Sequence, residues 1–285
     1  MIEPGTTAAV AWWVWPLALF AVCFVLGVFA VPAGVGGGVL FVPIVSAFFP
    51  FHLDFVRGAG LLVALAGALS AGPKLLEQGL ASLRLALPLG LVASIGSIFG
   101  ALIGLALPAH VVQAMLGATV LAVAAMMVLV RGEEFPRAVP DALAQRLGMQ
   151  GVVHGAHGEA LAWSAHRTPH GLVLFAVIGV FAGLFGLGAG WANVPTLNLV
   201  MGVPIKVAAG TSGVILAHAS SAAWVYLHHG AVLSMVAVPS MLGMMLGARV
   251  GARLLHAMPA TLVRHLLIVL LVLAGLRSLW KGLLG

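Results

Sequence analysis

The sequence predicts an all-α, polytopic membrane protein, and three observations support this prediction. Hydrophobic residues make up 62% of the 285 residues and charged residues only 7%, whereas a soluble domain has about 25% charged residues. Apolar runs of about 20 residues, the length that crosses a bilayer, recur along the chain. Two of these runs are interrupted by glycines in the same way. The net charge of +6 comes from basic residues that we place at the span ends, where they set the orientation and meet anionic lipid headgroups. Nucleic acid is therefore not an expected partner.

The apolar runs predict about eight transmembrane segments. They cover residues 11–49, 58–73, 83–107, 111–130, 171–201, 207–227, 231–256 and 261–280. The first segment has no basic residues before it, so we interpret it as a span and not as a cleaved signal. Segments one and five contain the glycine interruptions. Each is either a discontinuous span or a span with a re-entrant arm, and the sequence leaves this choice open.

The chain contains an internal repeat. The stretch Gly34–Pro43 recurs as Gly186–Pro195, 152 residues later. Later glycines and prolines keep this spacing to within one residue: Gly58 with Gly210, Gly79 with Gly230, Pro88 with Pro239, Gly96 with Gly247, Gly100 with Gly251 and Pro108 with Pro259. We therefore predict two homologous four-segment repeats, 1–130 and 171–285, joined by a polar linker, 131–170.

Four segments in each half predict that both halves have the same orientation, about an axis along the membrane normal. An extra crossing in the glycine arms would change this. Lys and Arg, counted by side, give eight residues on the side with the linker and the C-terminus, and four on the other. The positive-inside rule then places the linker and both termini in the cytoplasm of a bacterial inner-membrane protein.

The glycine interruptions predict a binding site for an anion. A broken helix exposes backbone N–H groups that must be buried in protein or line a wet cavity. The half-helix that follows presents free N–H groups and the positive end of its dipole. The donors expected here are the backbones of Gly36, Gly37 and Gly38, and those of Gly188, Ala189 and Gly190. The alternative is a pair of kinks needed only for packing.

Polar side chains near the interruptions extend this candidate site. Thr211 and Ser212 offer hydroxyl donors, and Asn193 offers an amide that binds substrate or satisfies freed backbone. Arg57 or Arg249 would supply the positive charge. The alternative for both arginines is a side chain that snorkels to the membrane surface.

Three further residues are candidates for gating and coupling. Asp54 and Lys206 occupy equivalent positions in the two halves and are a candidate gate pair, or else two solvated loop charges. His218 is a candidate for carrying a coupling proton, or else a hydrogen-bonded packing residue. The linker histidines have no metal-ligand spacing, so no metal or cofactor is expected.

Two glycine ladders predict close helix packing. Gly96, Gly100 and Gly104 recur at every fourth position in the third segment, and Gly243, Gly247 and Gly251 do so in the seventh. Small residues at this spacing let helix backbones approach closely in a membrane. We expect the ladders to hold these segments against partner helices, one option being each other.

The duplicated motifs resemble those of the TauE/SafE family of bacterial sulfite exporters. The resemblance rests on Gly-x-Gly-Gly-Gly-x-Leu-x-Val-Pro, then Gly-Thr-Ser, then Gly-Ala-x-x-Gly, and it covers both halves. It implies an inner-membrane carrier that often exports sulfite, organosulfonates or similar small anions. The chain departs from the pattern at Gly58–Gly60, where Gly-Thr-Ser is expected, and at Gly188–Gly190. We therefore expect an asymmetric site.

The predicted function is a secondary carrier for small sulfur-containing anions, coupled to a proton or ion gradient. A passive anion channel and a non-transporting assembly factor remain as alternatives. An enzyme is not expected, because the chain has no Gly-x-Ser-x-Gly or His-Glu-x-x-His motif and its spans lack a carboxylate base. The expected partners are the anionic substrate and membrane lipids, and a homodimer is left open.

Overall fold

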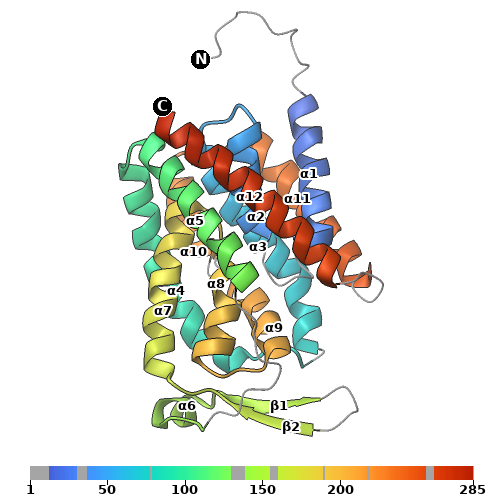
Figure 1. The fold of residues 1–285 in the computed structure, drawn as a ribbon, viewed down its shortest axis with the longest axis vertical. Helices are drawn as coiled ribbons and strands as arrows, with labels where there is room; N and C mark the ends of the chain where they lie inside the picture. The colour runs from blue at the N-terminus through green and yellow to red at the C-terminus, as the bar shows by residue number, and fades with distance from the viewer. Residues whose placement is uncertain are drawn as a thin grey trace, which may run out of the picture.

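The computed structural model describes residues 13–30, 37–77, 79–129, 139–154, 160–188, 190–216, 219–254 and 260–284. These residues form a bundle of helices with one small hairpin at its end (Figure 1). The helices of the first half are α1 (Val14–Ala30), α2 (Gly37–Phe48), α3 (Leu53–Glu77), α4 (Leu83–Ala106) and α5 (Ala109–Leu129). Those of the second half are α7 (Thr168–Phe185), α8 (Gly190–Pro195), the π-helix η1 (Thr196–Val200), α9 (Ile205–Ile215), α10 (Ala219–His228), α11 (Ser234–Leu254) and α12 (Ala260–Leu284).

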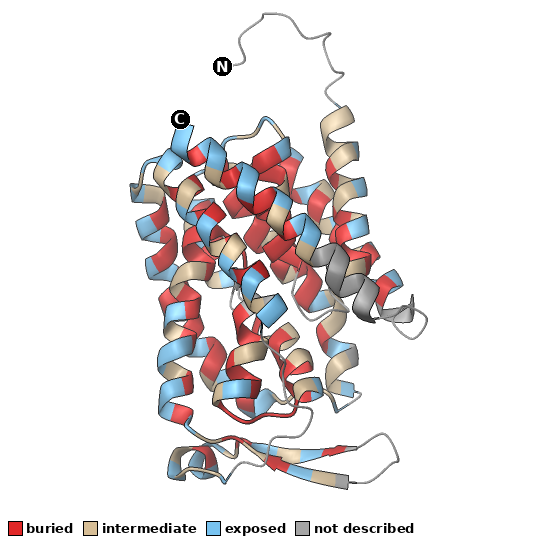
Figure 2. Cartoon of the chain, viewed as in Figure 1, coloured by how far each residue is buried: buried red, intermediate tan, exposed pale blue. Residues whose placement is uncertain are grey.

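The helices have the composition and surface of a polytopic membrane protein. Among the described residues, α3, α4, α5, α7 and α11 are long and apolar enough to cross a membrane. Large apolar side chains are exposed at every fourth position of α4, with Leu87, Leu91, Ile95 and Phe99 each more than half exposed. Such a stripe would be costly in water but is the normal lipid-facing surface of a span. Exposed and buried positions alternate around the outer helices in Figure 2.

The outer helices pack in pairs that exchange partners between the two halves. Helix α1 packs against α11, α4 against α7, and α5 against α12. The glycine ladders form the first two contacts, since Gly247 lies against the carbonyl of Phe24 and Gly96 against the carbonyl of Ala176. The ladders therefore pack against α1 and α7 and not against each other. Helices α2, α3, α9 and α10 lie between these pairs.

The two halves run in opposite directions through the bundle. We call the end where α1 begins and α12 finishes the termini end, and the opposite end, with the hairpin, the hairpin end (Figure 1). Helix α1 starts at the termini end, whereas α7 starts at the hairpin end. The expectation of equal orientation is therefore wrong. The physical reason is that the first segment holds two helices: α1 runs from the termini end into the bundle, and α2 runs back toward the termini end (Figure 1).

The linker lies at the hairpin end, opposite the start of α1 and the end of α12 (Figure 1). This differs from the expectation that the linker and both termini lie on one side. The linker contains the short helix α6 (Ala142–Leu147). It also contains an antiparallel hairpin of β1 (Gln150–His154) and β2 (Ala160–Ser164), which was not expected from the sequence.

The linker is folded against the bundle and is not a solvated loop. Trp163 and Met149 are buried in a shared apolar core with α4, α7 and α9. Asp141 caps α6 by accepting the Ala144 N–H at 2.6 Å, and it also accepts the Thr168 N–H at 2.6 Å. One carboxylate therefore ties the start of α6 to the start of α7.

Candidate functional site

The two broken segments meet in the middle of the bundle, on either side of α3. A Cβ on Gly38, in the first turn of α2, would lie 2.5 Å from the Leu187 carbonyl oxygen and 3.0 Å from that of Gly60. Gly186 ends α7 in the left-handed region, with φ 69°, and lies against the Arg57 backbone. Only glycine fits such approaches. We call Gly37, Gly38, Gly60, Gly186 and Gly188 the glycine junction.

The junction contains part of the predicted backbone donor set. Gly37 and Gly38 are buried and open α2, so their N–H groups have no carbonyl one turn earlier within that helix. Gly188 is buried in the left-handed region, and Gly190 opens α8. Gly36 and Ala189 lie outside the described residues. The structure therefore brings together the two segments that the duplicated motif singled out.

Two predicted side chains beside the junction are buried without hydrogen-bond partners. Asn193 is 0% exposed, and neither its amide nitrogen nor its oxygen has a partner. Ser212 is also 0% exposed, and its hydroxyl has none. They belong to α8 and α9, which pack against each other. An unsatisfied buried polar group costs about 1–3 kcal/mol, so these groups are expected to meet water or a ligand.

Thr211 is placed differently from its neighbour Ser212. Its Oγ1 accepts the backbone N–H of Ser82 at 3.0 Å. The adjacent Gly210 lies against the carbonyl of Leu80. These contacts fix the turn between α3 and α4 at the hairpin end, so Thr211 has a structural partner that Asn193 and Ser212 lack.

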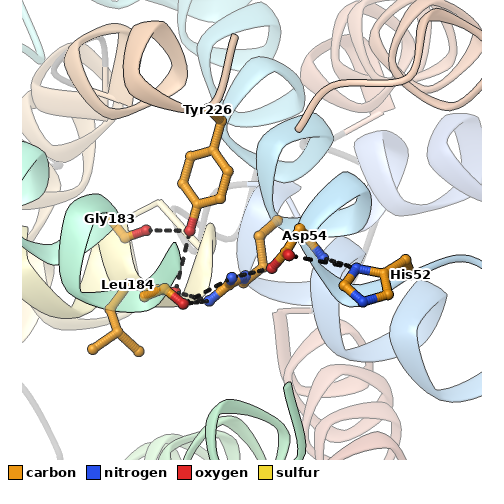
Figure 3. A network of polar contacts seen from close by, with 7 residues as sticks. His52, Asp54, Gly183, Leu184 and Tyr226 are labelled. Atoms are coloured by element: carbon orange, nitrogen blue, oxygen red, sulfur yellow. Dashed lines mark hydrogen bonds and ion pairs between the residues drawn. The ribbon is translucent and has the colours of Figure 1, made fainter. Parts of the chain in front are cut away.

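Arg57 forms the centre of a buried polar cluster, shown in Figure 3. Its Nη1 donates to the Gly104 carbonyl at 3.1 Å and to the Leu184 carbonyl at 3.0 Å. Its Nη2 donates to Gly104 at 3.1 Å and to the Asp54 carboxylate, which forms an ion pair with it. These carbonyls lie in the last turns of α4 and α7, where unpaired oxygens favour a cation.

Tyr226 completes this cluster from α10. Its hydroxyl donates to the Gly183 carbonyl at 3.1 Å, and the guanidinium carbon of Arg57 lies 5.5 Å from its ring centre. We call Asp54, Arg57 and Tyr226 the arginine clasp. It joins α3 to α4, α7 and α10 near the termini end. Tyr226 was not among the residues expected from the sequence, although it is the only tyrosine in the chain.

The clasp changes the interpretation of Arg57. The side chain is 1% exposed, so it does not snorkel to the surface. Carbonyls and a carboxylate occupy both terminal nitrogens of its guanidinium, and only Nε has no partner. The clasp gives Arg57 a structural role. Asp54 largely neutralises the positive charge that Arg57 was expected to offer to a bound anion.

Three other candidate residues, Arg249, Asp54 and Lys206, do not belong to the junction. Arg249 is exposed on α11, outside the buried core. The predicted pairing of Asp54 with Lys206 is wrong. Asp54 lies in the first turn of α3 and pairs with Arg57. Lys206 lies at the other end of α3, because Gly210, one turn after it in α9, contacts the Leu80 carbonyl in the loop after α3. The 25 residues of α3 separate the two by about 37 Å. His218 lies outside the described residues.

A polytopic bundle whose broken helices meet at a buried, partly unsatisfied polar site is the arrangement expected of a membrane transporter. Comparison of the sequence with protein families agrees. The family model described as sulfite exporter TauE/SafE matches residues 19–278. The chain belongs to the TauE/SafE family, as the duplicated motifs predicted.

Named relatives are also described as transporters. The chain is 26% identical over 264 residues to the probable membrane transporter protein ORF9 of Sinorhizobium sp., covering 92% of this chain and 91% of that protein. It is 22% identical over 263 residues to the probable membrane transporter protein YdhB of Bacillus subtilis, covering 92% and 99%. No solved structure matches the chain at a significant level.

Proposed function

We propose that this chain is a secondary carrier that exports small sulfur-containing oxyanions, such as sulfite or organosulfonates, across the bacterial inner membrane. Membership of the sulfite exporter family supports the substrate class. The observation that carries the proposal is the pair of buried, unpartnered polar side chains, Asn193 and Ser212, next to the glycine junction. The amide NH₂, the hydroxyl and the first N–H groups of α2 are all donors, which an oxyanion requires.

The charge of the site favours a monoanion over a dianion. Among the described residues, Arg57 is the only buried charged side chain, and its charge is balanced by Asp54. A dianion would bring two negative charges into the core without a net positive charge to balance them. Hydrogen-bond donors and a helix dipole stabilise a single negative charge more readily. The preferred substrates are accordingly hydrogen sulfite or a monosulfonate.

Two inverted repeats, residues 1–130 and 171–285, give this carrier its route for alternating access. Matched contacts support them: Gly58 lies against Ala231 as Gly210 lies against Leu80, with the roles of the halves exchanged. The junction then sits on the pseudo-twofold axis in the membrane plane, where such carriers bind substrate. The arginine clasp closes the termini end in this arrangement and must open when substrate passes.

Transport by purified protein in proteoliposomes tests the proposal. We expect saturable flux of sulfite and isethionate, driven by a pH or anion gradient, and slower flux of the dianion sulfoacetate. Asn193→Ala and Ser212→Ala should each reduce kcat/KM by about 5- to 100-fold, the value of one or two lost hydrogen bonds. Ser97→Ala is the matched control, because Ser97 is equally buried but bonds to Ser94 within α4.

The outcomes separate the competing functions. Flux that rises linearly with concentration and ignores counter-gradients would indicate a passive channel. No flux of any anion, with the protein folded and inserted, would favour an assembly factor. Normal kinetics in the Asn193→Ala, Ser212→Ala double variant would show that the junction is not the substrate site, even if sulfite is transported.

A further inference from the structure

A cavity opens at the termini end, between α2, α5 and α12. Its volume is about 540 Å³. The polar side chains that line it come from four places in the sequence and are Ser46, His52, His110, Gln113 and Lys281. None of these residues belongs to the glycine junction or to the arginine clasp. We call this cavity the vestibule.

Lys281 carries the positive charge of the described vestibule lining. The Lys281 ammonium donates to the Ser46 carbonyl at 3.2 Å and keeps two further N–H donors. The imidazoles of His52 and His110 add ring nitrogens that can donate. No described lining residue is acidic. The Asp54 carboxylate lies 3.4 Å from the Nδ1 of His52 and also forms an ion pair with Arg57.

The inner wall of the vestibule is held rigid by hydrogen bonds. The Gln113 amide donates to the Ser278 hydroxyl at 2.9 Å and lies 3.4 Å from the Ser46 hydroxyl. Ser278 donates in turn to the Gln113 carbonyl at 3.2 Å. Groups fixed in this way are preorganised and lose little entropy when they bind.

We propose that the vestibule is a second oxyanion site, which holds the anion outside the arginine clasp. The order of residues along α3 places it there: His52 precedes the helix and lines the vestibule, Arg57 forms the clasp, and Gly60 belongs to the junction. Helix α2 spans the same interval, and the eight residues from Gly38 to Ser46 cover about 12 Å. The role of a waiting position on the transport path rests on the proposed carrier function.

The oxyanion can come from two sources, a transported anion or a lipid phosphate. Trp15 packs edge-on against Phe49 and Phe51, and Trp280 is 69% exposed on α12. Tryptophans of this kind mark the depth of the lipid headgroups. A sulfonate and a phosphate present similar oxygens to Lys281 and the histidines, so the experiment must compare both.

Cysteine labelling measures the potential and the occupancy of the vestibule. Ala109 lines the cavity without contributing charge, and the single native cysteine, Cys23, is buried. In the Ala109→Cys protein, we compare rates of modification by an anionic sulfonatoethyl and a cationic aminoethyl methanethiosulfonate. Leu284→Cys, exposed at the same end, is the control position. A positive pocket should raise the ratio of anionic to cationic rates by about tenfold over the control.

Variants and competitors then decide whether the vestibule binds an oxyanion. Lys281→Gln should lower the rate ratio, and Lys281→Arg should restore it. Slowing of the anionic reagent by isethionate in phosphatidylcholine vesicles identifies a free anion as the ligand, and slowing only by phosphatidylglycerol identifies a lipid. Equal ratios at Ala109→Cys and Leu284→Cys, or a high ratio that neither competitor changes, would overturn the site.

The labelling experiment does not depend on transport. A failure to bind leaves the carrier proposal standing, because the glycine junction is tested separately by flux. Conversely, isethionate protection in a protein that moves no anion would support the vestibule and contradict the carrier. The two proposals therefore fail in different ways.

Discussion

At the scale of single residues, Arg57 shows how the bundle keeps a full charge in its interior. Ionised groups are costly inside a membrane unless they are paired and hydrogen-bonded. Arg57 meets both conditions, through Asp54 and through the carbonyls of Gly104 and Leu184. Its fork of donors bridges two helix ends at once, which the point charge of a lysine could not do in the same geometry.

Removing the carboxylate partner should destabilise the bundle. Asp54→Asn leaves Arg57 buried without a counter-charge, and because Asp54 is 30% exposed we expect a loss of about 1–3 kcal/mol, less than for a fully buried pair. Thermal unfolding of the detergent-solubilised protein measures this. Tyr226→Phe removes one hydroxyl and should cost about 1 kcal/mol. An unchanged melting temperature for Asp54→Asn would contradict the clasp.

Asn193 and Ser212 were recognisable from the sequence, whereas the clasp was not. Their positions follow a glycine interruption and a Gly-Thr-Ser step, and these local patterns survive in the fold. The ion-pair partner of Arg57, Asp54, lies only three residues earlier, a helical spacing that was not used. Its other partners, the backbone carbonyls of Gly104 and Leu184, lie 47 and 127 residues away. Every residue has a backbone carbonyl, so the residue type does not show which carbonyls accept a hydrogen bond from a side chain.

At the scale of elements, the start of α2 is the tightest contact between the two broken segments. Gly38→Ala would place a methyl group 2.5 Å from the Leu187 oxygen, so the junction must open. Transport is expected to fall by at least about tenfold, because a small displacement of a binding group has an effect of this order. Proteoliposome flux measures it, with inserted protein quantified.

Gly72→Ala is the matched control for this substitution. Gly72 lies in α3, and a Cβ there meets nothing within 4 Å. Alanine should preserve transport and stabilise the helix by about 0.5–1 kcal/mol. Equal effects of the two substitutions would show that helix propensity, and not contact at the junction, controls activity.

The linker is a second element whose packing can be tested. Burial raises the pKa of Asp141, but hydrogen bonds from Ala144 and Thr168 outweigh this and hold the pKa below its usual value. The carboxylate therefore stabilises the docked linker above the unfolded pKa of about 3.9, and this contribution is lost as the pH falls through the lower folded pKa. Docking should be constant between neutral pH and about pH 5.

Asp141→Ala removes the cap and the contact with α7 together. We expect faster hydrogen exchange in α6 and at the start of α7, equivalent to about 1–2 kcal/mol of lost local stability. Exchange in α5 and α12 should not change, because these helices lie outside the linker core. Protection in α6 that is the same in both proteins would contradict the capping role of Asp141.

At the scale of the whole molecule, the linker and the end of α12 lie at opposite ends of the bundle (Figure 1). Reporters inserted in the linker and fused after Gly285 should therefore report opposite sides of the membrane. Alkaline phosphatase and green fluorescent protein fusions in a bacterial host make this measurement. Activity of the same reporter at both positions would contradict the arrangement of the helices.

Composition was sufficient to predict the membrane class and the helical fold, and the repeated motif was sufficient to predict the family. The direction of each helix was not predictable in this way. Counting hydrophobic segments treats 11–49 as one segment, but the structure divides it into α1 and α2. The glycines predict the break, but the direction of α2 depends on its packing against α3 and α12, which the sequence does not show.

The exchange of partners between halves has a consequence for biosynthesis. Helix α1 is among the first to leave the ribosome, yet its partner α11 begins about 220 residues later. At 5–20 residues per second, α1 waits roughly 10–45 s in the membrane before the glycine ladder of α11 reaches it. During that interval its unpaired face is available to the insertion machinery, so the nascent chain depends on such helpers most strongly at its beginning.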